Sequence, residues 1–328
     1  MVYDLAIVRR GNLFVVVAAA TVLAGFVCPP RVSAQSATAD WEKAAGGKMS
    51  FDVTSVKPNA APMSQQTVSA NVPMGPGDYY APTGGLFSAT DMPLFSYITF
   101  AYKATGNQAQ ILRAQVPKWV LSERFDIQAR VTGAPTKDQM RLMMQSLLAD
   151  RFKLAMRRET RQIPVFALVV VKPGKLGPQI QPHPSDVPCT SAIAPGVMSG
   201  STSLPAPVAG GFPATCGGIQ GMDPSTPGRV RSGARDVTMA LIASTMSAMG
   251  NLDRPVLDRT GLTGGFDFTM EWTPQISGPL PPNTNFTPDP NGPTFLEALK
   301  EQLGFKLDSA TGPVDVLVVD HIEEPMPN

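Results

Sequence analysis

The chain has 328 residues, and its 27 basic and 26 acidic side chains give a formal net charge of +1. This balance creates no large electrostatic field to hold nucleic acid or an anionic membrane surface, so neither partner is indicated. Charged residues make up only 16% of the chain, whereas 33 prolines and 29 glycines predict long irregular connections between ordered elements.

Residues 1–34 are predicted to be a secretory signal peptide. A positive start at Arg9 and Arg10 is followed by an uncharged run, LFVVVAAATVLAGFV, and then by the small-residue site Val32-Ser33-Ala34. The run is shorter than the roughly 20 residues that a bilayer-spanning helix needs, so we expect cleavage between Ala34 and Gln35. An uncleaved membrane anchor is the alternative. Either way the protein is expected to be periplasmic or secreted, and about 290 residues remain after cleavage, enough for one large or two small domains.

Two cysteines of the mature chain, Cys189 and Cys216, bracket a stretch rich in Ser, Pro, Ala and Gly. In an oxidising compartment we expect them to form a disulfide, worth roughly 3 kcal/mol in the chain-entropy model. A metal or redox pair is the alternative. It is disfavoured because C-x-x-C spacing is absent and His183 has no second histidine nearby. No metal and no cofactor is therefore expected.

Hydrophobic periodicity predicts strands and helices in alternation. A tether over 35–50, with a short helix at 40–45, precedes a strand at 51–57 and a Pro/Gly/Ser-rich loop at 59–85. The expected elements that follow are a helix from Leu94 with Asp91 as N-cap, a segment 111–116, a turn Pro117-Lys118-Trp119, a strand 124–131, an amphipathic helix 136–150, and strands 152–158 and 165–172.

The same order returns downstream, which predicts an internal repeat. The matched pairs are Asp236-Val237-Thr238 with Asp91-Met92-Pro93, 254–258 with 111–119, Phe266-Asp267 with Phe125-Asp126, the helix from Thr294 with the helix from Thr136, and 314–320 with 165–171. Chance similarity between amphipathic segments is the alternative. The domain prediction is a first half at 51–177, a loop at 178–228 that contains both cysteines, and a second half at 229–328.

The predicted fold class is α+β, with two related helix-strand-strand halves, an antiparallel or mixed sheet, and long Pro/Gly-rich loops. The apolar strands of each half need a helix to cover one face, but the sequence leaves open whether the two halves share one sheet.

The string Asp258 to Gly265 is the most motif-like part of the chain. A glycine-rich loop can cradle phosphate where it opens a helix, but this loop leads into a strand. We therefore expect a turn, in which the glycines adopt positive φ and Asp258 and Thr260 bond the local backbone.

No catalytic residue is predicted. A hydrolytic triad needs a nucleophile beside a histidine, but the only histidines are His183 in a Pro-rich loop and His321 after the last strand. The acid pairs Glu323-Glu324 and Asp126 with Asp267 could act as general acid and base. Because the latter two occupy equivalent positions, we expect each to bond a neighbouring strand or turn instead.

Two further side-chain groups allow a binding or a structural interpretation. Met140, Met143 and Met144 could form an adaptable binding surface, but this stripe must also cover the sheet, so core packing is expected. Trp119 and Trp272 could grip a ligand as an exposed pair, and sheet-edge packing explains them equally well.

The chain from 51 to 328 resembles an uncharacterised family of exported acidobacterial proteins, a Solibacter-type paralogous family known only as a domain of unknown function. The strings that carry the resemblance are FDVTSVKPN, PKWVLSERFDIQAR, MRLMMQSLLADRFKLAMRRETRQIPVFALVV, RPVLDRTGLTGGFDFTMEW and ALKEQLGFKLDSATGPVDVLVVDHIEEPMPN. The resemblance implies an envelope or extracellular location and a sensing or binding role, with no active site to carry over. The helix-strand-strand units also look like the small α/β modules of secretins and TonB-dependent receptors, a likeness that conveys no function.

The functional hypothesis is a non-enzymatic binding, interaction or sensing module of the cell envelope. Its partner would be an unknown envelope protein or an extracellular ligand, with the loops 59–85 and 178–228 or strand edges as contact surfaces. Contact with the membrane is expected only through the signal segment, if it is uncleaved. The alternative is a carboxylate-dependent hydrolase acting on an envelope polymer or peptide.

Overall fold

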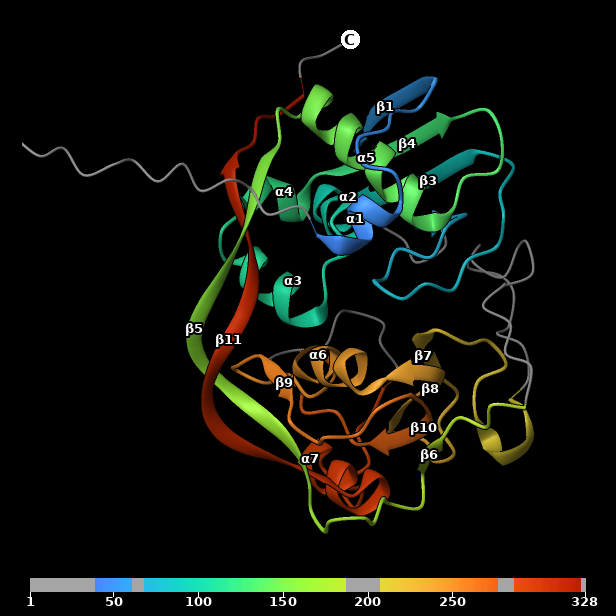
Figure 1. Cartoon of the computed structure of the whole chain (residues 1–328), viewed down its shortest axis with the longest axis vertical. Helices are drawn as coiled ribbons and strands as arrows, with labels where there is room; N and C mark the ends of the chain where they lie inside the picture. The colour runs from blue at the N-terminus through green and yellow to red at the C-terminus, as the bar shows by residue number, and fades with distance from the viewer. Residues whose placement is uncertain (1–38, 61–67, 187–206, 277–285, 326–328) are drawn as a thin grey trace, which may run out of the picture. The chain divides into compact units, whose positions relative to one another are not determined.

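The computed structural model describes residues 39–60, 68–186, 207–276 and 286–325 (Figure 1). They lie within one compact unit and form an α+β fold with three mostly antiparallel sheets, which confirms the predicted class. Within these ranges no helix has the length and the apolar character to cross a membrane. The signal peptide and the Ala34–Gln35 cleavage site lie outside the described residues.

The N-terminal sheet has the strand order β1-β4-β3-β2, and every pairing in it is antiparallel. Its strands are β1 (Val53–Asn59), β2 (Ser69–Ala70), β3 (Leu86–Pro93) and β4 (Arg124–Arg130). Along β4 the alternate side chains Phe125, Ile127 and Ala129 are buried, as period two predicts. Helices α2 (Leu94–Ala101) and α5 (Lys137–Arg151) contribute many of the other residues of this core. The α5 methionines are buried in it, so the core-packing interpretation of the methionine stripe is confirmed.

The C-terminal sheet has the order β6-β10-β8-β7, again with antiparallel pairings. Its strands are β6 (Ile180–Pro182), β7 (Gly218–Met222), β8 (Val230–Thr238) and β10 (Gly265–Trp272), and its core includes α6 (Met239–Met249), α7 (Phe295–Ala298) and the π-helical turn η2 (Leu299–Leu303). Trp272 is buried with its ring edge-on to Phe295, at 5.5 Å between ring centres. Trp119 packs against the N-terminal core, so the two tryptophans form no exposed pair.

Corresponding strands occupy corresponding places in these two sheets. The order β1-β4-β3-β2 of the N-terminal sheet matches the order β6-β10-β8-β7 of the C-terminal sheet, strand for strand. A helix also follows directly on both β3 and β8. This common order is consistent with the internal repeat, which itself stays a prediction.

The third sheet has the order β11-β5-β9 and corrects one prediction. The strands expected at 152–158 and 165–172 are one continuous strand, β5 (Ala155–Val170), which pairs along its length with β11 (Phe305–His321). Figure 1 shows the two as a long curved ribbon. Pairing with β11 supplies hydrogen-bond partners across the polar middle of β5, a long-range contact that local periodicity does not reveal. Strand β9 (Val256–Asp258) joins β5 in parallel.

Other local predictions also differ from the structure. The expected turn at 117–119 begins a short helix, α4 (Lys118–Ser122), because Pro117 suits a helix start. The segment 111–116 includes the end of α3 (Gly106–Arg113), so its supposed counterpart at 254–258, which holds β9, has a different structure. The segment 178–228, predicted as a loop, contains the turn η1 (Ala209–Gly211) and two strands of the C-terminal sheet, β6 and β7. The short helix predicted near residue 40 is confirmed as α1 (Asp40–Ala44).

Asp91 does not cap α2, contrary to the sequence prediction. It lies within β3 at φ 61°, and Pro93 holds the N-cap position. Asp236 likewise lies within β8 at φ 49°, and the hydroxyl of Thr238 caps α6 by accepting from Leu241 N at 3.3 Å. Both aspartates therefore stand at irregular points where a strand turns into a helix, and aspartate tolerates positive φ better than most residues.

Candidate functional site

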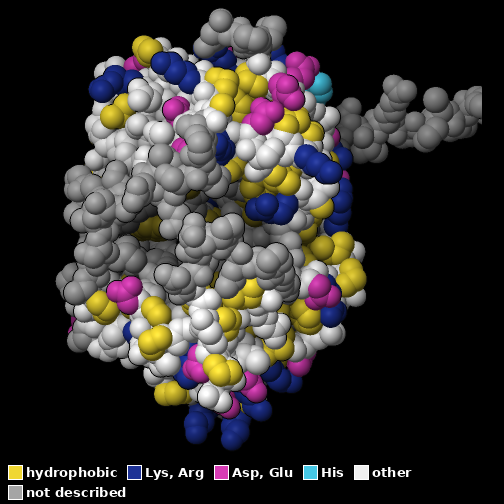
Figure 2. Space-filling view, turned by 180° about the vertical axis from the view of Figure 1, so that it is seen from behind, with side chains coloured by type: hydrophobic (Ala, Val, Ile, Leu, Met, Phe, Trp, Pro, Cys, Tyr) yellow, Lys and Arg dark blue, Asp and Glu magenta, His cyan; other side chains and the backbone are white. Residues whose placement is uncertain are grey.

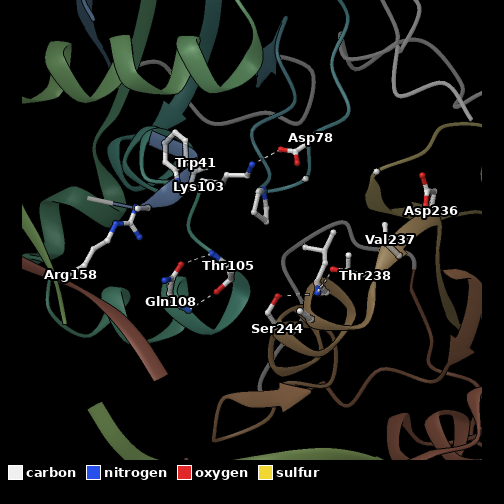
Figure 3. A pocket seen from close by; sticks show the side chains of 16 residues that line it. Trp41, Asp78, Lys103, Thr105, Gln108, Arg158, Asp236, Val237, Thr238 and Ser244 are labelled. Atoms are coloured by element: carbon white, nitrogen blue, oxygen red, sulfur yellow. Dashed lines mark hydrogen bonds and ion pairs between the residues drawn. The ribbon is translucent and has the colours of Figure 1, made fainter. Parts of the chain in front are cut away.

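A pocket of about 430 Å³ is bordered by elements of both sequence halves (Figure 3). Trp41, Asp78, Lys103, Thr105, Gln108 and Arg158 line it from the N-terminal half, and Asp236, Val237, Thr238, Leu241 and Ser244 from the C-terminal half. A volume of this order suits a small organic ligand, and the lining combines apolar surface with a few polar groups, as ligand sites do.

The N-terminal wall is fixed by a helix start. Thr105 caps α3, accepting from Gln108 N at 3.3 Å while the Gln108 side chain accepts from Thr105 N at 3.0 Å. Lys103, two residues earlier at φ 48°, places its ammonium 5.7 Å from the centre of the Trp41 ring and 2.6 Å from Asp78. The dashed line in Figure 3 marks this ion pair. The wall therefore presents an aromatic ring beside a neutralised lysine.

Two buried basic side chains of α5 hold the segment 75–79 in place beside the pocket. Lys137 Nζ donates to the carbonyls of Gly75, Gly77 and Tyr79 at 3.2, 2.6 and 3.3 Å. Arg141, which is fully buried, donates to the carbonyls of Gly75, Pro76 and Gly77 at 3.0–3.1 Å and pairs with Asp138 and Asp78. We call these two residues and the segment 75–79 the loop latch.

Two side chains of the loop latch, Lys137 and Asp78, have shifted pKa values. Burial, followed by the nearby Arg141 guanidinium, lowers the pKa of Lys137 to about 6. Burial also acts to raise the pKa of Asp78, but Lys103 and Arg141 outweigh it and hold that pKa below its ordinary value. Asp78 therefore carries its charge at neutral pH, paired with cations of its own wall.

The C-terminal wall is the junction between β8 and α6. The backbone N–H of Asp236 donates to Oδ1 of Asp267 at 3.0 Å, and the same oxygen lies 2.7 Å from His183 Nδ1. Asp267 thereby fixes the irregular backbone that turns the Asp236 side chain out of the sheet. Figure 3 shows Asp236, Val237 and Thr238 across the pocket from Trp41 and Arg158.

The two walls are tied together by a buried amide. Asn107 of α3 donates to Val256 O at 2.8 Å, and its Oδ1 accepts from Val256 N and from the Ser247 hydroxyl, both at 3.0 Å. At Gly106, a Cβ would come within 2.4 Å of Ser244 O, so only glycine permits this approach of α3 to α6. Elsewhere at the rim, Asp78 N donates to Gly217 O at 3.1 Å.

Most charges around the pocket are already neutralised. Lys103 pairs with Asp78 and Asp138, and Arg158 pairs with Glu42 at 3.0 Å. Asp236 is exposed, and no ion pair involves it among the residues that the structure describes. On the face seen in Figure 2, acidic and basic side chains are interspersed, in keeping with the balanced composition.

The two aspartates weighed for catalysis lie in separate sheets, Asp126 in β4 and Asp267 in β10. Oδ1 of Asp126 accepts from Asp91 N at 2.8 Å and from Asn59 Nδ2 at 2.9 Å, much as Asp267 serves Asp236 and His183. The expectation that each aspartate bonds a neighbouring strand or turn is confirmed.

The other residues singled out from the sequence lie away from the pocket lining. His321 Nε2 is 2.7 Å from exposed Glu323, and Glu324 is exposed beside it. In the 258–265 string, Asp258 accepts from the N–H and hydroxyl of Thr260 at 2.9 and 2.7 Å, which confirms the turn. Within the described ranges, no three His, Cys, Asp or Glu side chains gather as a metal site would require.

Cys216 is buried one residue before Gly217, whose carbonyl accepts from Asp78 N. Cys189 lies outside the described residues, so the disulfide stays a prediction.

The sequence did not predict this pocket, although the loops 59–85 and 178–228, expected to be contact surfaces, contribute Pro76, Gly77, Asp78 and Gly217 to its lining. Its lining comes from segments as distant as α1 and α6, and of its charged residues only Asp236 was singled out, as a helix start. For Asp236 the sequence signal was the alignment of the repeats, which places Gly265 where the first half has Arg124.

Comparison with known proteins places this chain in a family. The model of the family described as "Protein of unknown function (DUF3738)" matches residues 96–322, from α2 to just past β11. The chain belongs to this family, and the predicted resemblance to an uncharacterised domain family is confirmed at that level. Searches of curated proteins and of solved structures find no match.

Proposed function

We propose that the protein is an exported, non-enzymatic binding or sensing module of the cell envelope, and that the pocket between α1, α3 and α6 binds its ligand. The observation that carries this proposal is the pocket itself, in which an aromatic ring, apolar side chains and an exposed carboxylate converge on about 430 Å³. The signal-like segment 1–34 supports export, and the acidobacterial resemblance supports an envelope location.

The rigidity of the lining supports a binding role. Asn107 ties the walls together and the loop latch holds the segment 75–79, so the site is largely formed before a ligand enters. A preformed site avoids the cost of ordering loops on binding.

The test uses the mature chain, residues 35–328, and a panel of amino acids, di- and tripeptides and sugars. Binding is followed by thermal shift and by tryptophan fluorescence. We expect at least one class of compound to raise the melting temperature, and Trp41→Phe to remove the fluorescence response that Trp119→Phe retains.

A matched pair of variants locates the site. Ala240 and Ala248 are both exposed on α6, but only Ala240 lines the pocket. Ala240→Trp should block binding, and Ala248→Trp should leave it intact. Equal binding by both variants, or no binding of any compound to the wild type, would overturn the proposal.

The hydrolase alternative is tested with the same panel. Asp126 and Asp267 lie in separate sheets, and Oδ1 of each accepts a backbone N–H from the adjacent strand. Peptide cleavage is monitored by mass spectrometry. Cleavage by the wild type but not by Ala240→Trp would show that the pocket is a catalytic site and would support the hydrolase alternative.

Export is tested separately by N-terminal sequencing of the protein from the envelope or medium of cells that express the full chain. A mature terminus at Gln35 is expected. An intact Met1 terminus in the membrane fraction would instead indicate an uncleaved anchor.

A further inference from the structure

We propose that the pocket's ligand carries a guanidinium or similar cationic group, and that the carboxylate of Asp236 binds it. The inference rests on the proposed binding function and names the chemistry that the site selects. It follows from comparing Asp236 with its counterpart in the N-terminal sheet.

The counterpart is established by strand register. In the N-terminal sheet Met92 pairs with Phe125 and Pro93 with Arg124, and in the C-terminal sheet Val237 pairs with Phe266 and Thr238 with Gly265. Asp91 and Asp236 therefore hold the same position, one residue before these pairs. Both have positive φ, and both donate their N–H to Oδ1 of the aspartate in the Phe-Asp strand.

The two positions differ because, among the described residues, a cationic side chain of the protein faces the carboxylate at Asp91 but not at Asp236. In the N-terminal sheet, Nη1 of Arg124 pairs with Oδ1 of Asp91, whose side chain is fully buried. In the C-terminal sheet the residue at the place of Arg124 is Gly265, which has no side chain. A Cβ there would lie 2.0 Å from Asp236 Oδ1, so the carboxylate fills the space over the glycine.

The C-terminal position thus keeps the carboxylate and lacks the chain's own arginine. Asp236 is exposed in the pocket wall, with no ion pair among the described residues. The internal segments outside the described part, 61–67, 187–206 and 277–285, contain no lysine, arginine or histidine. A cation from a ligand would complete the arrangement that Arg124 completes in the other sheet.

The surroundings of Asp236 define the rest of the ligand. Val237 and Leu241 lie on the same wall, and Trp41 offers an aromatic face across the pocket. Lys103 and Arg158 are already paired with acids, so they offer little to a free anion. A ligand with one cationic end and a short apolar stem, such as an arginine side chain in a peptide, matches this lining. A guanidinium forms the charge-assisted, directional contact that a carboxylate favours.

The experiment measures binding of N-acetyl-arginine methylamide to the mature chain by calorimetry. Its isosteric uncharged control is the citrulline derivative, and the lysine derivative tests an ammonium. We expect the arginine probe to bind, the citrulline probe to bind at least tenfold more weakly, and Asp236→Asn to remove that difference. The control Asp253→Asn changes an exposed acid outside the pocket lining and should bind as the wild type does.

The outcomes separate this inference from the proposed function. If uncharged compounds bind at the pocket, as judged by Ala240→Trp, and Asp236→Asn leaves every affinity unchanged, the cation inference is wrong while the binding function stands. If the lysine probe binds as well as the arginine probe and both depend on Asp236, a cation site is supported and guanidinium selectivity is refuted. If no compound binds at the pocket, both proposals fail.

Discussion

Asp236 lies over Gly265 so closely that a single added carbon at residue 265 would come within 2.0 Å of its carboxylate. At the matching register position the N-terminal sheet has Arg124 facing Asp91. One sheet therefore neutralises its carboxylate internally, and the other presents it to a pocket. The same local geometry serves stability in one place and is available for recognition in the other.

The first prediction concerns the internal pair. Arg124→Met should lower the free energy of unfolding by about 3–5 kcal/mol, because it leaves the fully buried Asp91 carboxylate without this cation. Urea denaturation measures the loss. The double variant Arg124→Met/Asp91→Asn removes the charge as well and should recover part of the stability. If the single and double variants are equally stable, the Asp91 charge does not depend on Arg124.

The second prediction concerns the amide that ties the pocket walls. Asn107→Ala should destabilise the protein by about 1–3 kcal/mol, because it leaves the buried N–H and C=O of Val256 without their partner. Gln115→Ala is the control, since that side chain also bonds a distant carbonyl, Leu317 O, but does not tie the pocket walls. Asn107→Ala should weaken ligand binding and Gln115→Ala should not. Unchanged binding in both would show that the walls stay in place without this amide.

The third prediction tests the cysteine pairing. Mature protein that has not been reduced should show no reactive thiol when it is unfolded in denaturant. After reduction it should show two. Cys189→Ser and Cys216→Ser should each lower the melting temperature, because the open loop regains freedom in the unfolded chain. Two titratable thiols before reduction would refute the disulfide.

Much of the fold was readable from the sequence, and the reasons are local. Alternating apolar residues predicted β4, and the apolar stripe with its three methionines predicted α5. Asp91 was misassigned because aspartate favours both helix caps and positive φ, and long-range contacts with Asp126 and Arg124 hold it in the second conformation. The long strand β5 was missed because its partner, β11, lies more than a hundred residues away in the sequence.

The candidate site was less predictable than the fold. Lys137 and Arg141 look like surface residues of an amphipathic helix, yet both are buried beneath the segment 75–79, which has no periodic pattern of its own. The aligned repeats did contain the exchange of Arg124 for Gly265. That this exchange leaves Asp236 without the arginine that faces Asp91 follows only from the strand register, which places Asp236 next to Gly265.

The last prediction is a pH dependence of stability that originates at Lys137. Its pKa is about 6 in the folded protein, against an ordinary value of 10.5, because burial and Arg141 disfavour the ammonium. Between these two values the unfolded chain binds more protons than the folded one at this residue. The free energy of unfolding should therefore rise with pH across that window, by up to about 1.4 kcal/mol per pH unit from this residue.

Lys137→Met isolates this contribution, because every other ionisable group is common to the two proteins. Urea unfolding at pH 6.5 to 9 should show a steeper rise for the wild type than for the variant. Relative to the wild type, the variant should be most stable at the acidic end, where the wild type either buries an ammonium or loses its proton on folding. It should be least stable relative to the wild type at the alkaline end. It still keeps the bonds from Arg141 to the carbonyls of Gly75 and Gly77, so it is expected to fold. Parallel pH profiles would show that the carbonyls and the Tyr79 ring, 4.8 Å from Nζ, hold Lys137 charged despite its burial.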